Sequence, residues 1–357
     1  MVAGSIAAGL PGLQSHWRRL AHMFAIFASS TVCALVGFAA TPSLPATMAV
    51  AAFDHGGGPE VLGPRTMPIP HPGAGEVLIR LRAATVGAWE AGTRRQPSPG
   101  TKFPAVLGAE GAGTIVALGA GVHDFRLGDE VFGTGDGFYA EYAIALADNI
   151  ARVPVGLDAK SAAALGISGL SALQGLDEVL QVKAGEHLII HGATGGVGVL
   201  AIQFAKRRGV KVLATVASDE GFALAKRLGA DVVVNGKTGN IAAAAKEFAP
   251  RGVDAVLGLV GGLSLEACVD TLREDGRGRV AYLYGIEPLP RPRYGPRMSL
   301  YSYRAGRDEM LALTRMVAAA HVEVPIAAEY PLAKAADAHV QLEAGGLLGK
   351  ILLRMGP

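Results

Sequence analysis

The residues best suited to chemistry form one short stretch in the middle of the chain. Residues 188–206 read LIIHGATGGVGVLAIQFAK, where an apolar run meets a cluster of small residues and a helical pattern starts near Val197. Glycine lets a backbone turn sharply and approach a ligand, and a helix N-terminus offers free N–H groups with a partial positive charge. Such a turn suits the diphosphate of a dinucleotide. The residues expected to bind it are Thr194, Gly195, Gly196 and Val197, with Gly198 beside them.

This stretch departs from the usual dinucleotide pattern at one position. Ala193 takes the place of the first glycine, which leaves Ala-x-Gly-Gly-x-Gly. A glycine cluster by itself also fits a plain turn. Because further strand–helix alternations follow it, we predict a dinucleotide site.

The second strand of the alternation indicates which dinucleotide is bound. An NAD site usually has an acidic residue near the end of this strand, about 20 residues past the glycines, to hold the ribose 2′-hydroxyl. Here the strand KVLATVAS contains no acid and ends at Ser218, and the acids that follow can equally cap the next helix. A hydroxyl in place of a carboxylate tolerates a 2′-phosphate, which Lys226 or Arg227 could pair with. We therefore expect NADPH rather than NADH, although a plain N-cap also explains Ser218.

The chain shows two different sequence patterns, one before this stretch and one that includes it. From Met48 onward, short runs rich in Val, Ile and Leu are broken by Gly, Pro and Asp, which indicates a mostly β half. After about residue 159, apolar strands alternate with amphipathic helices, which is typical of a parallel sheet covered on both faces. The predicted fold class is therefore α/β, with a Rossmann doubly wound parallel sheet and a second, mostly β domain.

The composition of the chain limits which metal sites and partners are expected. The chain has 357 residues, a formal net charge of +2 and only two cysteines, Cys33 and Cys268. Two cysteines cannot build a four-cysteine zinc site, and neither Cys-x-x-Cys nor His-Glu-x-x-His occurs. No basic stripe with interleaved aromatics is present, so no nucleic-acid partner is expected. No metal site is predicted.

The first 47 residues stand apart from the rest. A basic stretch precedes the uncharged, largely apolar residues 23–40, and small residues and prolines then run to Met48. This order is typical of a secretory signal. The alternative is that translation starts at Met48 and that the preceding residues are spurious. The protein would then be cytoplasmic, whereas a retained segment 23–40 would make it exported or membrane-anchored.

The chain resembles the zinc-independent quinone oxidoreductase (zeta-crystallin-like) branch of the medium-chain dehydrogenase/reductase superfamily. The resemblance runs from about Met48 to the C-terminus, and the residues that carry it read FDHGGGPEVL, FPAVLGAEGAGTIVALGAGVHDFRLGDEVFG, GFYAEYA, GLSALQGL, AGEHLIIHGATGGVGVLAIQFAKRRG and LGKILLRM. It implies a GroES-like β domain, a Rossmann domain and a cleft where the nicotinamide meets the substrate. It also implies a homodimer formed through the Rossmann sheets.

The resemblance implies domain bounds and further cofactor contacts. The bounds are 1–47 for the N-terminal extension, 48–168 for the GroES-like domain, 169–304 for the NADP-binding domain and 305–357 for a segment that returns to the GroES-like domain. The implied cofactor-binding residues are Ser171, Tyr284, Gly285 and Lys350. A core serine, a strand-to-loop turn and a surface lysine are the plainer interpretations of these positions.

The sequence departs from the family where substrate chemistry is expected. Relatives commonly show Asn-x-x-Asp with a tyrosine soon after it, whereas this chain has Gly87, Glu90 and Gly92 there, and it adds Trp89. One interpretation is a roomier, apolar pocket. The other is that Trp89 packs in the core, with the arginines at 94 and 95 solvated. No catalytic residue is assigned, although Tyr139, Tyr284 or Tyr301 could donate a proton.

These observations lead to two functional hypotheses. The first is a zinc-independent reductase that transfers hydride from NADPH to a small quinone or an activated alkene or carbonyl, which such an acceptor allows because the charge that develops on it is delocalised. The second is a non-catalytic nucleotide-binding sensor or scaffold of the same fold. The missing asparagine and tyrosine motivate the second.

Overall fold

The computed structural model describes residues 44–293 and 295–356. The expectations for the signal-like or spurious segment, including the apolar residues 23–40, fall outside this described part. Within it, no helix is both long enough and apolar enough to cross a bilayer.

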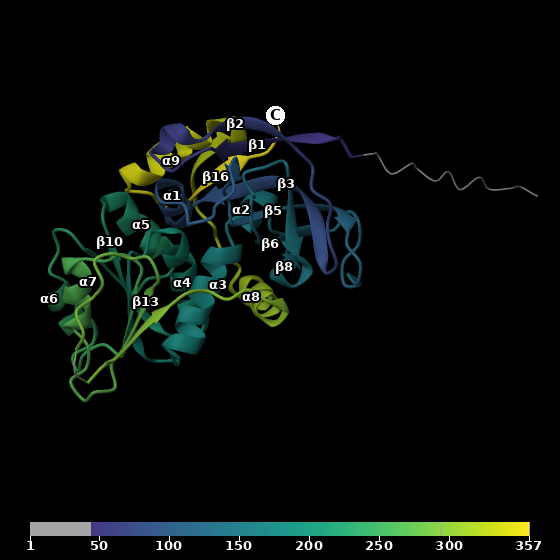
Figure 1. The fold of residues 1–357 in the computed structure, drawn as a ribbon. Coiled ribbons are helices and arrows are strands. Elements are labelled where there is room, and N and C mark those ends of the chain that lie inside the picture. The colour runs from purple at the N-terminus through teal and green to yellow at the C-terminus, as the bar shows by residue number, and fades with distance from the viewer. Residues whose placement is uncertain (1–43, 294, 357) are drawn as a thin grey trace, which may run out of the picture. The chain divides into compact units, whose positions relative to one another are not determined.

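A parallel sheet forms one half of the described chain (Figure 1). All of its neighbouring strands run parallel, in the order β11-β10-β9-β12-β13-β14. The first strand in the chain thus lies in the middle, which is the doubly wound arrangement that the alternating pattern predicts. The strands are β9 (His187–His191), β10 (Lys211–Val216), β11 (Val232–Asn235), β12 (Ala255–Gly258), β13 (Arg279–Leu283) and β14 (Arg297–Tyr301).

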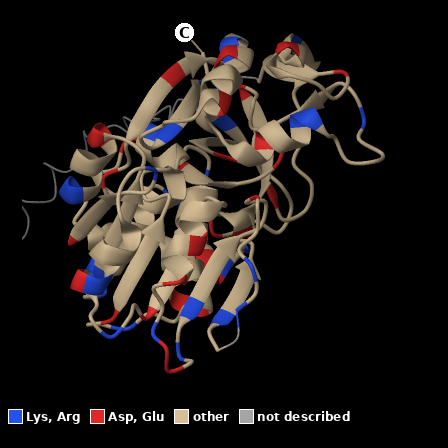
Figure 2. Cartoon of the chain, turned by 90° about the vertical axis from the view of Figure 1, so that its left-hand side faces the viewer, with Lys and Arg blue, Asp and Glu red and all other residues tan. Residues whose placement is uncertain are grey.

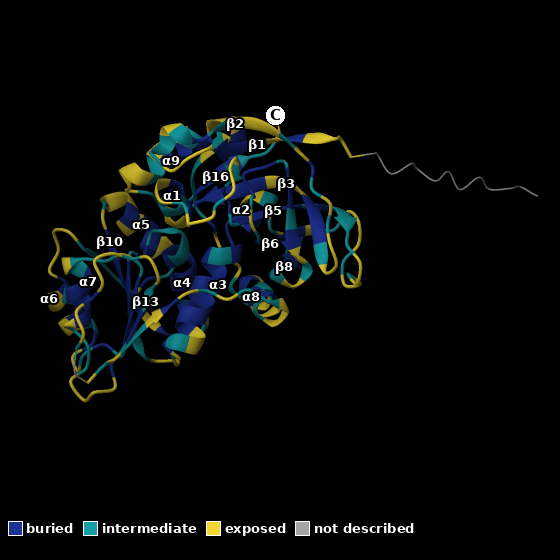
Figure 3. Ribbon diagram, viewed as in Figure 1, coloured by how far each residue is buried: buried dark blue, intermediate teal, exposed yellow. Residues whose placement is uncertain are grey.

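Helices cover both faces of this sheet. Because successive side chains of a strand point to opposite faces, Leu188 and Ile190 pack with one group of helices while Ile189 packs with the other. The first group is α3 (Gly166–Gln174), α4 (Gly196–Arg207), α5 (Asp219–Arg227) and α8 (Arg307–Ala320). The second group is α6 (Ile241–Phe248) and α7 (Leu263–Val269). The central strands β9, β10 and β12 are almost fully buried (Figure 3), as expected for a parallel sheet covered on both faces.

The other half consists of two sheets whose strands are mostly antiparallel. The larger has the order β15-β16-β3-β5-β6-β8, with β7 also paired to β3, and the smaller has the order β2-β1-β4. The strands are β1 (Thr47–Phe53), β2 (Gly63–Pro68), β3 (Glu76–Val86), β4 (Ala105–Val106), β5 (Glu110–Leu118), β6 (Glu130–Thr134), β7 (Tyr142–Leu146), β8 (Ile150–Arg152), β15 (Ile326–Pro331) and β16 (Lys350–Arg354).

Short helices and turns join strands of the β half or lead from it into the parallel-sheet half. They are α1 (Ala88–Arg95), α2 (Ala159–Ala163) and α9 (Ala335–Ala344), with short turns at Pro59–Val61, Ala147–Asn149, Gly175–Val179 and Leu332–Lys334. The late strand β16 pairs antiparallel with the early strand β3. A late segment of the chain therefore completes the larger sheet, which the early strand β3 starts. Figure 2 shows Lys and Arg residues intermingled with Asp and Glu along the ribbon, in keeping with many surface ion pairs.

Candidate active site

The predicted glycine turn lies at the carboxyl end of β9. Gly195 is the N-cap of α4, and the helix begins at Gly196, one residue before the expected start. A Cβ atom on Gly198 would come within 2.5 Å of the carbonyl oxygen of Gly192, so only glycine lets α4 pack this closely on the turn. No described residue accepts a hydrogen bond from the amides of Gly196, Val197 and Gly198. These free N–H groups fit an anionic diphosphate.

Lys350 adds a positive charge to this turn. The amide of Gly349 donates to the carbonyl of Thr194 at 2.8 Å, and Gly349 forms an isolated parallel bridge with Gly195. The next residue, Lys350, lies so close that a Cβ on Gly196 would be 2.3 Å from its Cδ. The structure therefore brings Thr194, Gly195, Gly196 and Lys350 together at the glycine turn.

A buried carboxylate holds Lys350 in place. The Nζ atom of Lys350 lies 2.6 Å from Oε1 of Glu110, whose side chain is 2 % exposed. Glu110 also accepts hydrogen bonds from the Oγ1 of Thr85 at 2.7 Å and from the amides of Ile167 and Ser168 at the start of α3. Burial alone would raise the pKa of Glu110, but Lys350 and these donors hold it below its ordinary value. Glu110 thus joins β5, β16 and α3 beneath the turn.

A second buried carboxylate, Glu90, lies in the first turn of α1. Its Oε2 accepts from the amide of Gly87 at 3.1 Å, and its Oε1 accepts from the amide of Ala109 at 3.2 Å. Burial raises the pKa of Glu90 to about 7, with Lys350 acting in the opposite direction and Glu110 acting with burial. The Glu90 carboxyl is therefore able to hold a proton at neutral pH.

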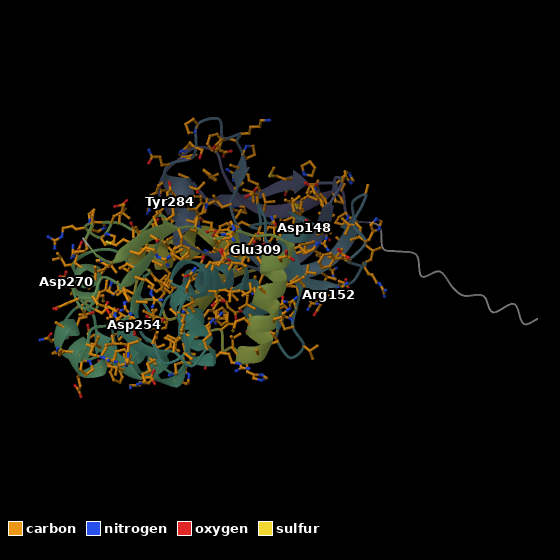
Figure 4. All side chains as sticks on the ribbon, turned by 90° about the horizontal axis from the view of Figure 1, so that it is seen from below. Asp148, Arg152, Asp254, Asp270, Tyr284 and Glu309 are labelled. Carbon is orange, nitrogen blue, oxygen red and sulfur yellow. The ribbon has the colours of Figure 1, made fainter. Side chains whose placement is uncertain are left out.

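Trp89, the residue before Glu90, lies at the surface of the protein. Trp89 is 63 % exposed, so the interpretation that it packs in the core is wrong. Its ring lies 6.2 Å, centroid to centroid, from the ring of Tyr284, which is 61 % exposed and follows β13. Tyr284 is labelled in Figure 4, where the parallel-sheet ribbon approaches the ribbon of the other half. Two large aromatic side chains, one from α1 and one from the loop after β13, thus meet at the surface.

Arg94 lies inside the protein, so the interpretation of both neighbouring arginines as solvated loop charges is wrong for this one. Its guanidinium donates to the carbonyl of Gly57 at 3.1 Å, to Nδ1 of His339 at 2.9 Å and to Oε1 of Glu343 at 2.6 Å. Because arginine can only donate, Nδ1 of His339 accepts and its Nε2 carries the proton toward the Oη of Tyr139, 3.1 Å away. Burial, with Arg94, lowers the pKa of His339 to about 4, so this histidine is neutral. Arg94 therefore fixes α1 against α9.

Three tyrosines lie close to these buried groups, and the hydroxyls of two of them are engaged in hydrogen bonds inside the protein. Tyr139 is fully buried and bonded to His339, and Tyr301 donates to the carbonyl of Ser171 at 2.9 Å. Tyr303, which the sequence analysis did not single out, is partly buried near the two carboxylates. Burial, with the charges of Glu110 and Glu90, raises its pKa to about 12. Its only signal in the sequence is its place two residues after the end of β14.

The remaining predicted cofactor residues are spread along three elements. Ser218 is the N-cap of α5 and accepts from the amide of Gly221 at 3.1 Å, so the plain-cap interpretation is correct whatever else it does. Ser171 is buried in α3. The serine beside the turn is instead Ser168, whose Oγ would lie 3.3 Å from a Cβ on Gly196. Gly285 follows Tyr284 with a φ of +92°, a conformation that favours glycine.

Lys226 does not lie with the others. It occupies the last turn of α5, about two turns from the helix N-terminus, and its Nζ donates to the carbonyl of Asp231 at 2.6 Å. Its neighbour Arg227 pairs with Glu323 at 2.8 Å. The predicted contact between Lys226 and a 2′-phosphate is therefore wrong, because the helix directs this residue to its far end.

Histidine and cysteine form no metal cluster in the described residues. No group of three or more His, Cys, Asp or Glu side chains gathers there in a way that could hold an ion. His191 is buried and its Nδ1 lies 2.7 Å from the Oγ1 of Thr215, which makes it a satisfied core residue. Burial lowers its pKa to about 4.

Comparison with known proteins places this geometry in context. An alcohol dehydrogenase GroES-like domain matches residues 73–155, which confirms the predicted nature of the β half, and a zinc-binding dehydrogenase domain matches residues 228–353. The quinone oxidoreductase of Homo sapiens is 33 % identical over 323 residues, covering 85 % of this chain and 97 % of the human protein.

Solved structures agree with this match. The quinone oxidoreductase of Escherichia coli complexed with NADPH superposes with a TM-score of 0.78 at 26 % identity, over 87 % of this chain and 100 % of that one. A mycobacterial protein complexed with NADPH superposes with a TM-score of 0.77 at 31 % identity, over 86 % of this chain and 99 % of that one. The likeness covers both the parallel sheet and the β half.

Proposed function

This chain belongs to the medium-chain dehydrogenase/reductase superfamily, in its quinone oxidoreductase branch, and on this premise we propose that it transfers hydride from NADPH to a small conjugated acceptor. The acceptor class is a quinone or an activated alkene or carbonyl, and the reaction needs no zinc ion. That the chain is a nicotinamide-dependent oxidoreductase follows from its family. The proposal concerns the acceptor, the coenzyme contacts and the absence of a metal step.

One observation carries the proposal. The amides of Gly196, Val197 and Gly198 are free at the carboxyl end of β9, and the side chain of Lys350, whose ammonium pairs with Glu110, packs against Gly196. Ligands of doubly wound sheets bind at this edge, and a helix N-terminus with a nearby cation stabilises an anion there. These residues would hold the coenzyme diphosphate, and Tyr284 and Gly285 at the end of the neighbouring strand β13 would flank the nicotinamide.

The coenzyme supplies the hydride, and the chain supplies binding, orientation and the control of protons. Glu110 fixes the position of the Lys350 ammonium beside the turn, because removing either partner of their buried ion pair would leave the other charge uncompensated. Glu90 holds a proton near neutral pH in a site shielded from water. The zinc-independent part rests on the sequence, which has only two cysteines and lacks the catalytic cysteine and the four-cysteine lobe of zinc-dependent relatives.

Three further expectations stay as proposals of the same kind. The chain divides at residues 47, 168 and 304, in keeping with sheets that draw their strands from 47–152 with 326–354 and from 187–301. It forms a homodimer through the parallel sheets, whose outer strand β14 carries the exposed Leu300. The acceptor is a small molecule rather than a macromolecule.

The test is NADPH oxidation by the full chain with a panel of quinones and enones. We expect turnover with at least one acceptor and tighter binding of NADPH than of NADH in calorimetric titrations. Gly196→Val, which places branched carbons in the phosphate cradle, is expected to abolish binding of both coenzymes. If the chain binds neither coenzyme, the proposal is wrong.

The alternative of a non-catalytic sensor or scaffold remains favoured by one observation. Gly87 and Gly92 stand where relatives commonly have an asparagine and a tyrosine, so the usual polar groups beside the substrate are missing. Tight NADPH binding without single-turnover hydride transfer to any acceptor of the panel would support this alternative. Transfer to one acceptor excludes it.

A further inference from the structure

Two aromatic side chains stand exposed at the edge of the candidate active site. Trp89 projects from the first turn of α1, and Tyr284 follows the last residue of β13. Their ring centroids are 6.2 Å apart with an angle of 52° between the ring planes. More than half of each side chain is exposed, although large aromatic residues are usually mostly buried. A pair left open in this way is a candidate for ligand binding.

The pair lies next to the predicted coenzyme site. Tyr284 leaves the carboxyl edge of the parallel sheet, and Val260 leaves the same edge after the neighbouring strand β12. Val260 is 53 % exposed, and its Cγ2 would lie 2.8 Å from a Cβ on Gly192 in the glycine turn. The exposed side chain of Val260 therefore lies beside the glycine turn, at the end of the strand next to the one that Tyr284 follows.

Buried contacts hold the Trp89 side of the pair in place. Its neighbour Glu90 is anchored by the amides of Gly87 and Ala109, and Arg94 ties the other end of α1 to His339 and Glu343 of α9. The backbone that carries Trp89 is thus fixed at both ends of one short helix. A preorganised aromatic surface loses little conformational entropy when a flat ligand stacks on it.

We propose that Trp89 and Tyr284 form an aromatic recognition surface for the flat, conjugated ring of the acceptor. The inference rests on the proposed function and deepens it by naming the substrate class. Because the two ring planes are 52° apart, a fused-ring quinone stacked on the indole of Trp89 would meet the Tyr284 ring at an edge, whereas a small open-chain enone has no ring to stack. The chain therefore prefers fused-ring acceptors, and the preference depends on the indole of Trp89.

A binding experiment tests the surface without turnover. The chain has two tryptophans, Trp17 and Trp89, so the full-length Trp17→Phe variant reports on the indole of the proposed surface alone. We expect phenanthrenequinone to change its emission saturably in the absence of coenzyme, and methyl vinyl ketone to leave it unchanged. Calorimetric titration of Trp89→Ala with phenanthrenequinone should show an affinity lower by about two- to tenfold, the usual worth of an aromatic pair.

Steady-state kinetics then tests whether Trp89 determines the preference for the acceptor. Trp89→Ala should raise the KM for phenanthrenequinone by about two- to tenfold with kcat nearly unchanged, because stacking contributes equally to ground-state and transition-state binding. In Trp89→Phe the KM for phenanthrenequinone should return most of the way to the parent value. Leu311→Ala, which removes an exposed apolar side chain from α8, is the control and should leave both constants unchanged.

The outcomes separate the two proposals. If Trp89→Ala binds and reduces phenanthrenequinone as the parent does while the enzyme turns over, the aromatic surface is refuted and the proposed function stands. If no acceptor is reduced but phenanthrenequinone binds in a manner that depends on Trp89, the surface stands and the proposed function falls. A non-saturable emission change, equal in free tryptophan, would also refute the surface.

Discussion

Replacing Lys350 with methionine tests how the β half is coupled to the glycine turn. Methionine has a similar length and removes only the charge and its donors. The ammonium group lies 2.6 Å from Oε1 of Glu110, and the two side chains are 13 % and 2 % exposed. The substitution therefore leaves a buried carboxylate with its neutral donors alone, namely Thr85 and the amides of Ile167 and Ser168.

The expected loss of stability is large. Two unit charges about 4 Å apart attract each other by about 4 kcal/mol at an effective dielectric constant of about 20. Removal of one partner from a buried ion pair costs about 3–5 kcal/mol, because the other charge stays buried. The remaining neutral donors stabilise the Glu110 carboxylate in part, so we expect Lys350→Met to lower the free energy of unfolding by about 3 kcal/mol at neutral pH.

The pH dependence of this loss has a definite sign. In the parent the pKa of Glu110 lies below its ordinary value, so the stabilisation is present above that value and fades as the pH falls through the lower, folded pKa. Without Lys350, burial raises the pKa of Glu110, and the carboxyl takes up a proton more readily as the pH falls. The deficit of Lys350→Met should therefore shrink toward acidic pH.

Urea unfolding from acidic to neutral pH, with Glu110→Gln and the double variant, measures this coupling. The double variant should be more stable than the sum of the two single losses predicts, because neither charge is then left alone. NADPH titration of the same proteins should show weaker binding wherever Lys350 is absent. Additive losses with no dependence on pH would refute the reasoning.

Four further predictions about stability follow from the same structure. Gly198→Ala should destabilise the protein by about 1–3 kcal/mol through a backbone clash, whereas Gly195→Ala, whose Cβ would meet nothing closer than 3.7 Å, should lie within experimental error in urea unfolding. Because the pKa of Glu90 is raised from 4.5 to about 7, the native state binds a proton that the unfolded chain has lost. The free energy of unfolding should therefore fall by about 3 kcal/mol as the pH rises from 4.5 to about 7. If the difference in this free energy between the parent and Glu90→Gln does not change with pH, the prediction is wrong. Arg94→Lys should lose about 2 kcal/mol in thermal unfolding, because an ammonium cannot replace the forked guanidinium, and an unchanged midpoint would count against this. Ser218→Ala should cost about 1 kcal/mol through the lost helix cap, and an equally stable variant would show that the cap is dispensable.

Local patterns in the sequence were enough to predict the parallel sheet and the glycine turn at the start of α4. The alternation of apolar strands with amphipathic helices predicted the parallel order, and the small residues after β9 predicted the turn within one residue of the helix start. Both depend on periodicity and glycine geometry, which act over a few neighbouring residues. The cap at Ser218 was readable for the same reason.

The positions that sequence reasoning misplaced depend on distant segments. Which side of α1 is buried is decided by His339 and Glu343, more than two hundred positions later, so Arg94 went inside and Trp89 outside. The pairing of Lys350 with Glu110 likewise joins β16 to β5. No spacing rule along the chain contains this information, because it arises only when the two halves pack.

The return of the chain at Gly349 and Lys350 has a consequence for biosynthesis. The ribosome completes the strands of the parallel sheet well before it adds these residues, which dock on Thr194 and Glu110. During this interval the emerging polypeptide presents a glycine turn without its cation, and β3 lacks its neighbour β16. The contacts of Gly349 and Lys350 with the glycine turn and with Glu110 can therefore form only after β16 has been added, about 150 residues after the turn itself.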